Sequence, residues 1–153
     1  MSARYLLAFS LVTLTGCQAT TAASEPDSLT QARARWEAHN LGSYRFEMSR
    51  TCVCVLGGRR MEVTVHAGSV SAAADLDNNN SVEAALLTYV TTIPDLFDLI
   101  EDALGRKAAY FSAMYDPILG YPTRIDIDYS ATTADDELTI TVRDLAVLES
   151  AAP

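Results

Sequence analysis

Positive charge is scarce in this 153-residue sequence. Lys107 is its single lysine, and 11 basic residues face 20 acidic ones, so the formal net charge is −9. Nucleic-acid-binding proteins neutralise phosphates with clusters of Lys and Arg, and the sequence contains no such cluster. The composition therefore argues against a nucleic-acid partner and is typical of an acidic surface that keeps a domain soluble.

The sequence also has few of the residues that catalysis and metal binding require. His39 and His66 are its two histidines, and no glycine-framed nucleophile or phosphate-binding glycine loop is present. These absences favour a non-enzymatic role without a cofactor. They also disfavour zinc at the two cysteines of the domain, because structural zinc sites need four ligands.

No apolar run is long enough to cross a membrane. The longest, residues 5–14, follows Arg4 and falls short of the roughly 20 residues that span a bilayer. A positive start, a short apolar segment and small residues are typical of a secretory signal peptide.

The signal ends in Leu14-Thr15-Gly16-Cys17, which resembles the lipobox of bacterial lipoproteins. The resemblance implies that residues 1–16 are removed and that Cys17 carries the lipid (including palmitate-type acyl chains) that anchors the protein to the membrane. An ordinary signal peptide with an incidental cysteine is the alternative. By the same resemblance, Gln18 in place of Asp indicates the periplasmic side of the outer membrane if the cell is Gram-negative.

The polar residues 17–27 are expected to form a flexible tether, followed by one domain over 28–149 and a frayed tail over 150–153. Ser28 and Gln31 have capping-box spacing and predict a helix over 29–39. Thr92, Pro94 and Asp95 predict a second helix that stops at Gly105. Between and after the helices, apolar residues alternate with polar ones over 44–54, 61–67, 70–74, 109–115, 125–129 and 138–142.

This order of elements predicts an α+β domain of two layers. We expect an antiparallel sheet of five to six strands, with the two helices packed on one face and the other face exposed to solvent. A bulge near Arg50 and Thr51 would keep Arg50 off the apolar face.

Several landmarks occur in an order that resembles a bacterial family of predicted lipoproteins, the domain of unknown function 6174. In chain order they are Trp36, Ser43-Tyr44-Arg45-Phe46, Cys52-Val53-Cys54, Val63-Thr64-Val65, Gly68, Leu96-Phe97-Asp98, Ile100, Tyr115-Asp116-Pro117-Ile118-Leu119-Gly120-Tyr121-Pro122 and Ile125-Asp126-Ile127-Asp128. The resemblance covers about residues 30–147. It implies no activity and no catalytic residue.

Cys52 and Cys54 remain as a pair once Cys17 is assigned to the lipid. An even number of cysteines in an exported protein indicates a disulfide. Two buried thiols, or a redox- or metal-responsive pair, are the alternatives.

The segment 75–83 begins like a calcium-binding loop, with oxygen-bearing side chains at Asp75, Asp77, Asn79, Ser81 and Glu83. Two features of such loops are missing, because Asn80 replaces the turn glycine and Leu86 replaces the bidentate glutamate. A polar surface loop is the preferred interpretation, and a calcium-steadied domain is the alternative.

Asp126 and Asp128 share a strand face, and paired carboxylates can carry out acid–base chemistry when one is desolvated. Because the sequence places them on the solvent-exposed face, a solvated pair is the preferred interpretation. We therefore expect a binding module of the cell envelope that contacts an envelope protein or component through this face. The candidate contributors are Tyr110, Met114, Asp126, Asp128 and Thr139.

Overall fold

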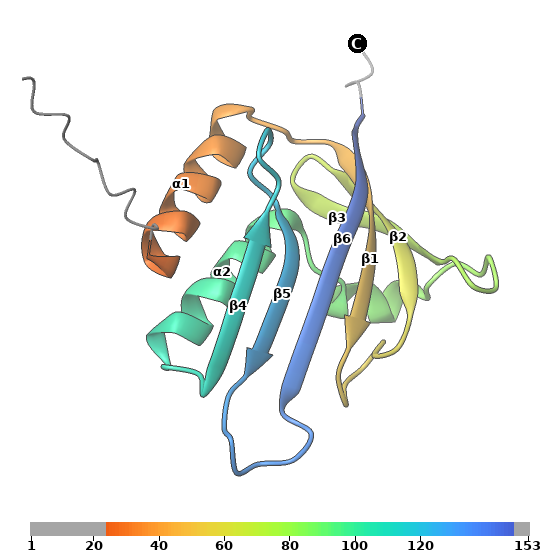
Figure 1. The fold of residues 1–153 in the computed structure, drawn as a ribbon. Helices are drawn as coiled ribbons and strands as arrows, with labels where there is room; N and C mark the ends of the chain where they lie inside the picture. The colour runs from red at the N-terminus through yellow and green to blue at the C-terminus, as the bar shows by residue number, and fades with distance from the viewer. Residues whose placement is uncertain (1–23, 149–153) are drawn as a thin grey trace, which may run out of the picture.

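The computed structural model describes residues 24–148, which form two α-helices, a 3₁₀-helix and six strands (Figure 1). In chain order these elements are α1 (Glu25–Ala38), β1 (Tyr44–Thr51), β2 (Arg60–His66), β3 (Ser69–Asp75), η1 (Ala84–Tyr89), α2 (Ile93–Gly105), β4 (Tyr110–Tyr115), β5 (Pro122–Asp128) and β6 (Glu137–Val147). The strands form one sheet in the order β3-β2-β1-β6-β5-β4, and each neighbouring pair is antiparallel. The predicted α+β class and antiparallel sheet are confirmed.

Some of the sequence predictions concern residues outside the described part of the chain. These are the signal peptide over 1–16, lipidation at Cys17, the tether up to residue 23 and the tail over 150–153.

Helix α1 begins at Glu25, four residues before the predicted start, so residues 25–27 are helical and do not belong to a tether. Ser24, rather than Ser28, is the N-cap: its Oγ accepts a hydrogen bond from the Asp27 amide at 3.4 Å, and Pro26 lies in the first turn. Proline is favoured there because the first-turn amides have no partner within the helix.

The strands bury alternate residues, as the sequence pattern predicts. On the central strand β1, Tyr44, Phe46 and Met48 are buried, whereas Arg45 and Glu47 are not. The core continues on both sides through apolar residues of its neighbours, among them Met61, Val63, Val65, Ile125, Ile127, Ile140 and Val142. A single buried face therefore runs across the strands.

The predicted start of α2 is confirmed in detail. The Thr92 amide donates to Asp95 Oδ2 at 2.7 Å, and the Asp95 amide donates to Thr92 Oγ1 at 3.3 Å. This reciprocal capping box satisfies two amides that the helix leaves free. It positions the buried residues Leu96, Phe97 and Ile100 toward the core.

The turn that connects β4 to β5 packs against α1. Asp116 Oδ1 accepts hydrogen bonds from the amides of Ile118 and Leu119 at 2.9 and 2.6 Å, which fixes the turn. Gly120 has φ +85° and lies so close to the backbone of Ala32 and Trp36 that a Cβ atom would clash with it. The turn therefore needs glycine both for its conformation and for the space.

We predict that Gly120→Ala lowers the free energy of unfolding by about 2 kcal/mol or more, since it combines a strained left-handed alanine with overpacking. Urea denaturation would measure the loss. The matched control is Gly105→Ala, where a Cβ has open space and alanine in a helix is worth up to about 1 kcal/mol. Equal stability of the Gly120→Ala protein and the wild type would contradict this packing.

Candidate functional site

The five binding-face candidates lie on the neighbouring strands β4, β5 and β6. Tyr110 is opposite Asp128, and Asp126 is opposite Thr139. Met114 pairs with Arg124, and both Tyr110 and Met114 are more than half exposed. The sheet thus brings the five residues together.

Asp126 is held in a hydrogen-bonded network. Arg124 donates to both of its oxygens through Nε and a terminal nitrogen, at 2.6 and 2.8 Å, and Thr139 Oγ1 donates at 2.8 Å. Burial on its own would raise the pKa of Asp126, but these hydrogen bonds and the Arg124 charge lower it below its ordinary value. A carboxylate kept ionised in this way is a poor general acid.

The loop proposed as a calcium site uses its leading carboxylate in another way. Asp75 is buried, and its oxygens accept hydrogen bonds from the Asp77 amide, Asn78 Nδ2 and an Arg59 guanidinium nitrogen at 2.9, 3.2 and 3.5 Å. Asp77 pairs with Arg60. Within residues 24–148, no group of three or more His, Cys, Asp or Glu side chains is arranged to hold a metal ion. The Asp75 carboxylate therefore accepts hydrogen bonds from its own loop, and the Asp77 carboxylate forms an ion pair.

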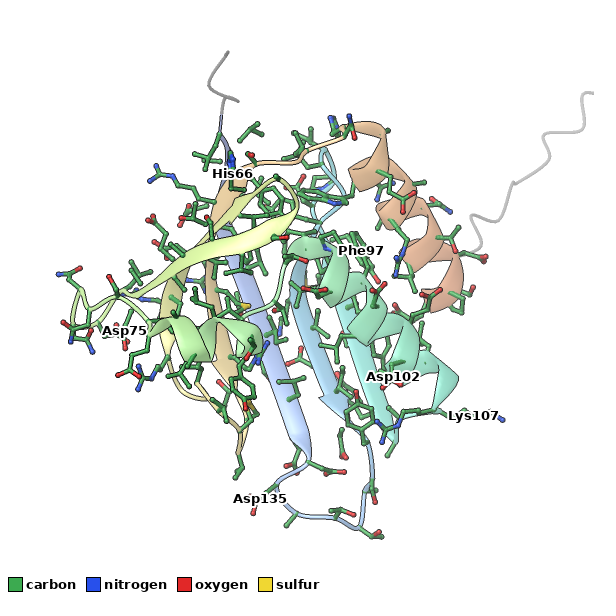
Figure 2. The ribbon with its side chains drawn as sticks, turned by 180° about the vertical axis from the view of Figure 1, so that it is seen from behind. His66, Asp75, Phe97, Asp102, Lys107 and Asp135 are labelled. Atoms are coloured by element: carbon green, nitrogen blue, oxygen red, sulfur yellow. A yellow bond between two sulfur atoms is a disulfide. The ribbon has the colours of Figure 1, made fainter. Side chains whose placement is uncertain are left out.

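The histidines lie apart from the cysteines. His66 Nδ1 is 3.2 Å from Ser43 Oγ, and His39 Nε2 is 3.4 Å from the Ile118 carbonyl oxygen. Figure 2 shows His66 at the opposite end of the domain from Asp135. Both histidines therefore belong to local surface contacts.

Cys52 and Cys54 follow the end of β1 and lie in a loop, not on the apolar face of the strand. Their sulfurs are in close contact, and their Cα atoms are 5.3 Å apart, a separation that suits a disulfide. Cys54 is exposed to solvent.

Arg50 shows why the predicted bulge is not needed. The β1–β6 register is continuous from Glu47 to Thr51, and its one irregularity lies between Arg45 and Glu47. Arg50 stays on the side of Met48, and its guanidinium donates to the Tyr89 carbonyl at 3.2 Å and to Thr91 Oγ1 at 3.3 Å. Burial lowers the pKa of Arg50.

Arg50 and the cysteine pair line a groove of about 710 Å³, which we call the α2–β6 groove. Its lining residues come from the end of β1 and the following loop, from α2 and the segment before it, and from the β5–β6 loop and the start of β6: Arg50, Cys52, Val53, Cys54, Thr91, Asp95, Asp98, Leu99, Asp102, Tyr129, Asp135, Asp136, Glu137 and Leu138. Figure 2 shows Asp102 on α2 and Asp135 on the β5–β6 loop, in the same half of the domain. The volume lies within the range of about 300–1,000 Å³ that is typical of ligand sites.

The groove combines apolar side chains with excess negative charge. Asp95 caps α2, Asp98 pairs with Arg33, and Asp102 pairs with Arg106. In contrast, Asp135, Asp136 and Glu137 form no ion pair within residues 24–148. The side of the groove at the start of β6 therefore carries three carboxylates that no described cation pairs with.

Two residues that line the groove each have a buried polar atom without a hydrogen-bond partner among the described residues. The atoms are Arg50 Nε, a donor, and Asp136 Oδ1, an acceptor. Buried polar atoms are satisfied in most proteins, so each exception calls for an explanation.

The chain is thus an α+β domain with a groove between α2 and the start of β6. The chain belongs to the family of unknown function DUF6174, whose model matches residues 28–147. No curated protein and no solved structure matches it. Between residues 24 and 148, no helix is both long and apolar enough to traverse a lipid bilayer.

The sequence predictions did not include the groove. Its walls come from segments that are up to 88 positions apart, from Arg50 to Leu138, and no local spacing reveals such a set. The sequence contained one signal of the groove: Arg50 occupies an apolar position in the alternating pattern of β1.

We predict that the contribution of Asp126 to stability depends on pH. Because its pKa is lowered in the folded state, the contribution is present above the ordinary value of about 3.8 and is lost as the pH falls through the lower folded value. Asp126→Asn should therefore be less stable than wild type at neutral pH, and the difference should shrink in acid. Urea denaturation over a pH series measures this. Glu47→Gln is the control, because Glu47 forms no ion pair within the described chain. A pH-independent difference between Asp126→Asn and wild type would contradict the Asp126 network.

Proposed function

We propose that this protein is a non-catalytic binding module that a lipid anchors in the bacterial cell envelope. The α2–β6 groove carries the proposal, because it is a concave site of ligand size with apolar and charged walls. The groove residues include no nucleophile paired with a base among the described side chains, which favours binding over catalysis.

The anchor is inferred from Leu14-Thr15-Gly16-Cys17 after a short apolar segment. A diacylated or triacylated Cys17 would suffice for stable attachment, since two or more chains hold a protein on a bilayer. Gln18 supports a location on the periplasmic side of the outer membrane in a Gram-negative cell.

We also infer that α1 and α2 cover the same face of the sheet. The Trp36 ring of α1 meets Tyr44 edge-on at 5.1 Å between centroids, and the Phe97 ring of α2 stacks on Tyr115 at 6.3 Å. In Figure 1 both helices lie beside the β4–β5 half of the sheet. The opposite face, with Tyr110, Met114, Asp126, Asp128 and Thr139, would then be a second contact surface for an envelope component.

A disulfide between Cys52 and Cys54 fits this module, because it would fix the loop that forms one wall of the groove. One observation favours the alternative of a redox-responsive protein: the pair lines the groove, and Cys54 is exposed. The calcium alternative has less support, since Asp75 already accepts three hydrogen bonds from the protein.

We expect the membrane-extracted protein to have the intact mass of a chain that begins at an acylated Cys17, and to gain two alkylated thiols only after reduction. Cys17→Ser should lack the mass of the acyl chains and retain its signal peptide. An unlipidated chain in the soluble fraction would overturn the anchor. Two thiols that alkylate without reduction would overturn the disulfide.

We expect a photo-crosslinking amino acid in place of Leu138, which lines the groove, to give a discrete adduct of constant mass in cells. The same amino acid in place of Ser71, an exposed residue of β3 outside the groove, is the control. Adducts of equal yield at the two positions, or none at Leu138, would count against the groove as the binding site.

A further inference from the structure

The ring that Cys52 and Cys54 close is small for a stabilising cross-link. The two cysteines are two positions apart in the sequence, and their sulfurs are in close contact. A disulfide restricts the unfolded chain more when it closes a longer loop, so a ring of three residues contributes less to stability than most disulfides do. Stabilisation of the domain is therefore a weak explanation for this pair.

Other contacts already hold the loop that carries the cysteines. The Gly57 amide donates to the Cys54 carbonyl at 3.0 Å, and the Gly58 amide donates to the Arg50 carbonyl at 2.7 Å. Leu56 is buried in the hydrophobic core and attaches the loop to the rest of the domain. We therefore expect the loop to stay folded when the bond between the two sulfurs is broken.

The cysteine pair lies where a second molecule can reach it. Cys54 is exposed and Cys52 is partly buried, so Cys54 is the more accessible of the two. Both line the α2–β6 groove of about 710 Å³, which leaves space for an incoming thiol group. Thiol–disulfide exchange depends on access and on which sulfur is attacked, and exposed disulfides are more labile than buried structural ones.

Apolar side chains flank the accessible cysteine. Val53 and Val55, directly before and after Cys54, are 76% and 45% exposed. The centres of protein–protein interfaces are more apolar than the rest of the protein surface. A small thiol would leave both valines uncovered, whereas a protein that docks around Cys54 would bury them. The surface around the sulfur therefore fits a protein thiol.

We propose that Cys52 and Cys54 form a thiol–disulfide exchange site that accepts two electrons from a dithiol of another exported protein. A thiolate of that protein attacks Cys54 Sγ, the bond between the two sulfurs breaks, and Cys52 leaves as a thiolate that takes a proton from water. The second thiolate of the partner then attacks the partner's own sulfur in the mixed disulfide and releases Cys54, which is protonated in turn. The two thiols of the partner have lost their protons to water and end as a disulfide, while Cys52 and Cys54 end as two thiols. This activity goes beyond the proposed function and does not depend on what the groove binds.

The first test measures the redox equilibrium of the full, membrane-extracted protein in glutathione buffers. Acid quenching, alkylation and intact mass count the free thiols. We expect the fraction of reduced protein to change with the ratio of reduced to oxidised glutathione, because the glutathione pool reduces labile disulfides but not structural ones. A pair whose redox state is the same at every ratio would overturn the proposal.

Reduction should also leave the domain folded. We expect an unchanged circular dichroism spectrum and a shift of the urea midpoint by less than about 1 M, since the ring is small. A domain that unfolds on reduction would show that the disulfide is structural, and would overturn the proposal. The attacked sulfur is identified with N-acetylcysteamine, a monothiol. Early acid quenching and peptide mapping should place the mixed disulfide on Cys54, and an adduct on Cys52 would contradict the assignment.

Val53→Ser tests whether the reductant is a protein. Reduced thioredoxin serves as the protein dithiol and dithiothreitol as the small one. The variant should slow reduction by thioredoxin about fivefold, because an apolar contact is lost on docking, and should leave the rate with dithiothreitol unchanged. The control Ile118→Ser removes an exposed apolar side chain outside the groove and should change neither rate. Equal slowing with both reductants, or no slowing by Val53→Ser, would overturn the assignment to a protein dithiol.

Discussion

The contacts of one buried tyrosine connect the main parts of this domain. Tyr44 begins the central strand β1, which pairs with β2 and with β6, and its side chain is 1% exposed. Its ring meets Trp36 of α1, and its hydroxyl accepts the hydrogen bond of the Ile93 amide at 3.1 Å, at the start of α2. The sheet and both helices thus share a single anchor. Because the Ile93 amide is one that the helix itself cannot satisfy, the tyrosine also fixes where α2 begins.

That anchor determines the position of the α2–β6 groove. One wall of the groove is α2, and another is the far end of β1, six residues beyond Tyr44 at Arg50. Arg50 then joins the two walls through its hydrogen bonds to Tyr89 and Thr91, just before α2. The same strand therefore contributes to both features: the start of β1 packs in the apolar core, and its end lines the charged groove.

Local patterns predicted most of the fold, because helix caps and strand alternation depend on neighbouring residues. The spacing of Thr92 and Asp95 correctly predicted that α2 begins directly after Thr92. The predicted start of α1 was wrong because Ser24 and Ser28 are both suitable N-cap residues. Pro26 favours Ser24, since proline is well accommodated in the first turn of a helix. The groove could not be predicted, since it depends on which strands become neighbours. The Arg50 bulge was wrong because the arginine finds carbonyl and hydroxyl partners from a distant segment, which no strand pattern contains.

The early start of α1 limits how far the domain can extend from an anchor at Cys17. Only eight residue steps separate Cys17 from Glu25, and a fully extended chain of that length reaches at most about 28 Å. With a lipid on Cys17, the first turn of α1 would therefore lie within that reach of the bilayer, which is less than the thickness of the membrane itself. A connection of this length would therefore hold the domain next to the membrane that carries the lipid.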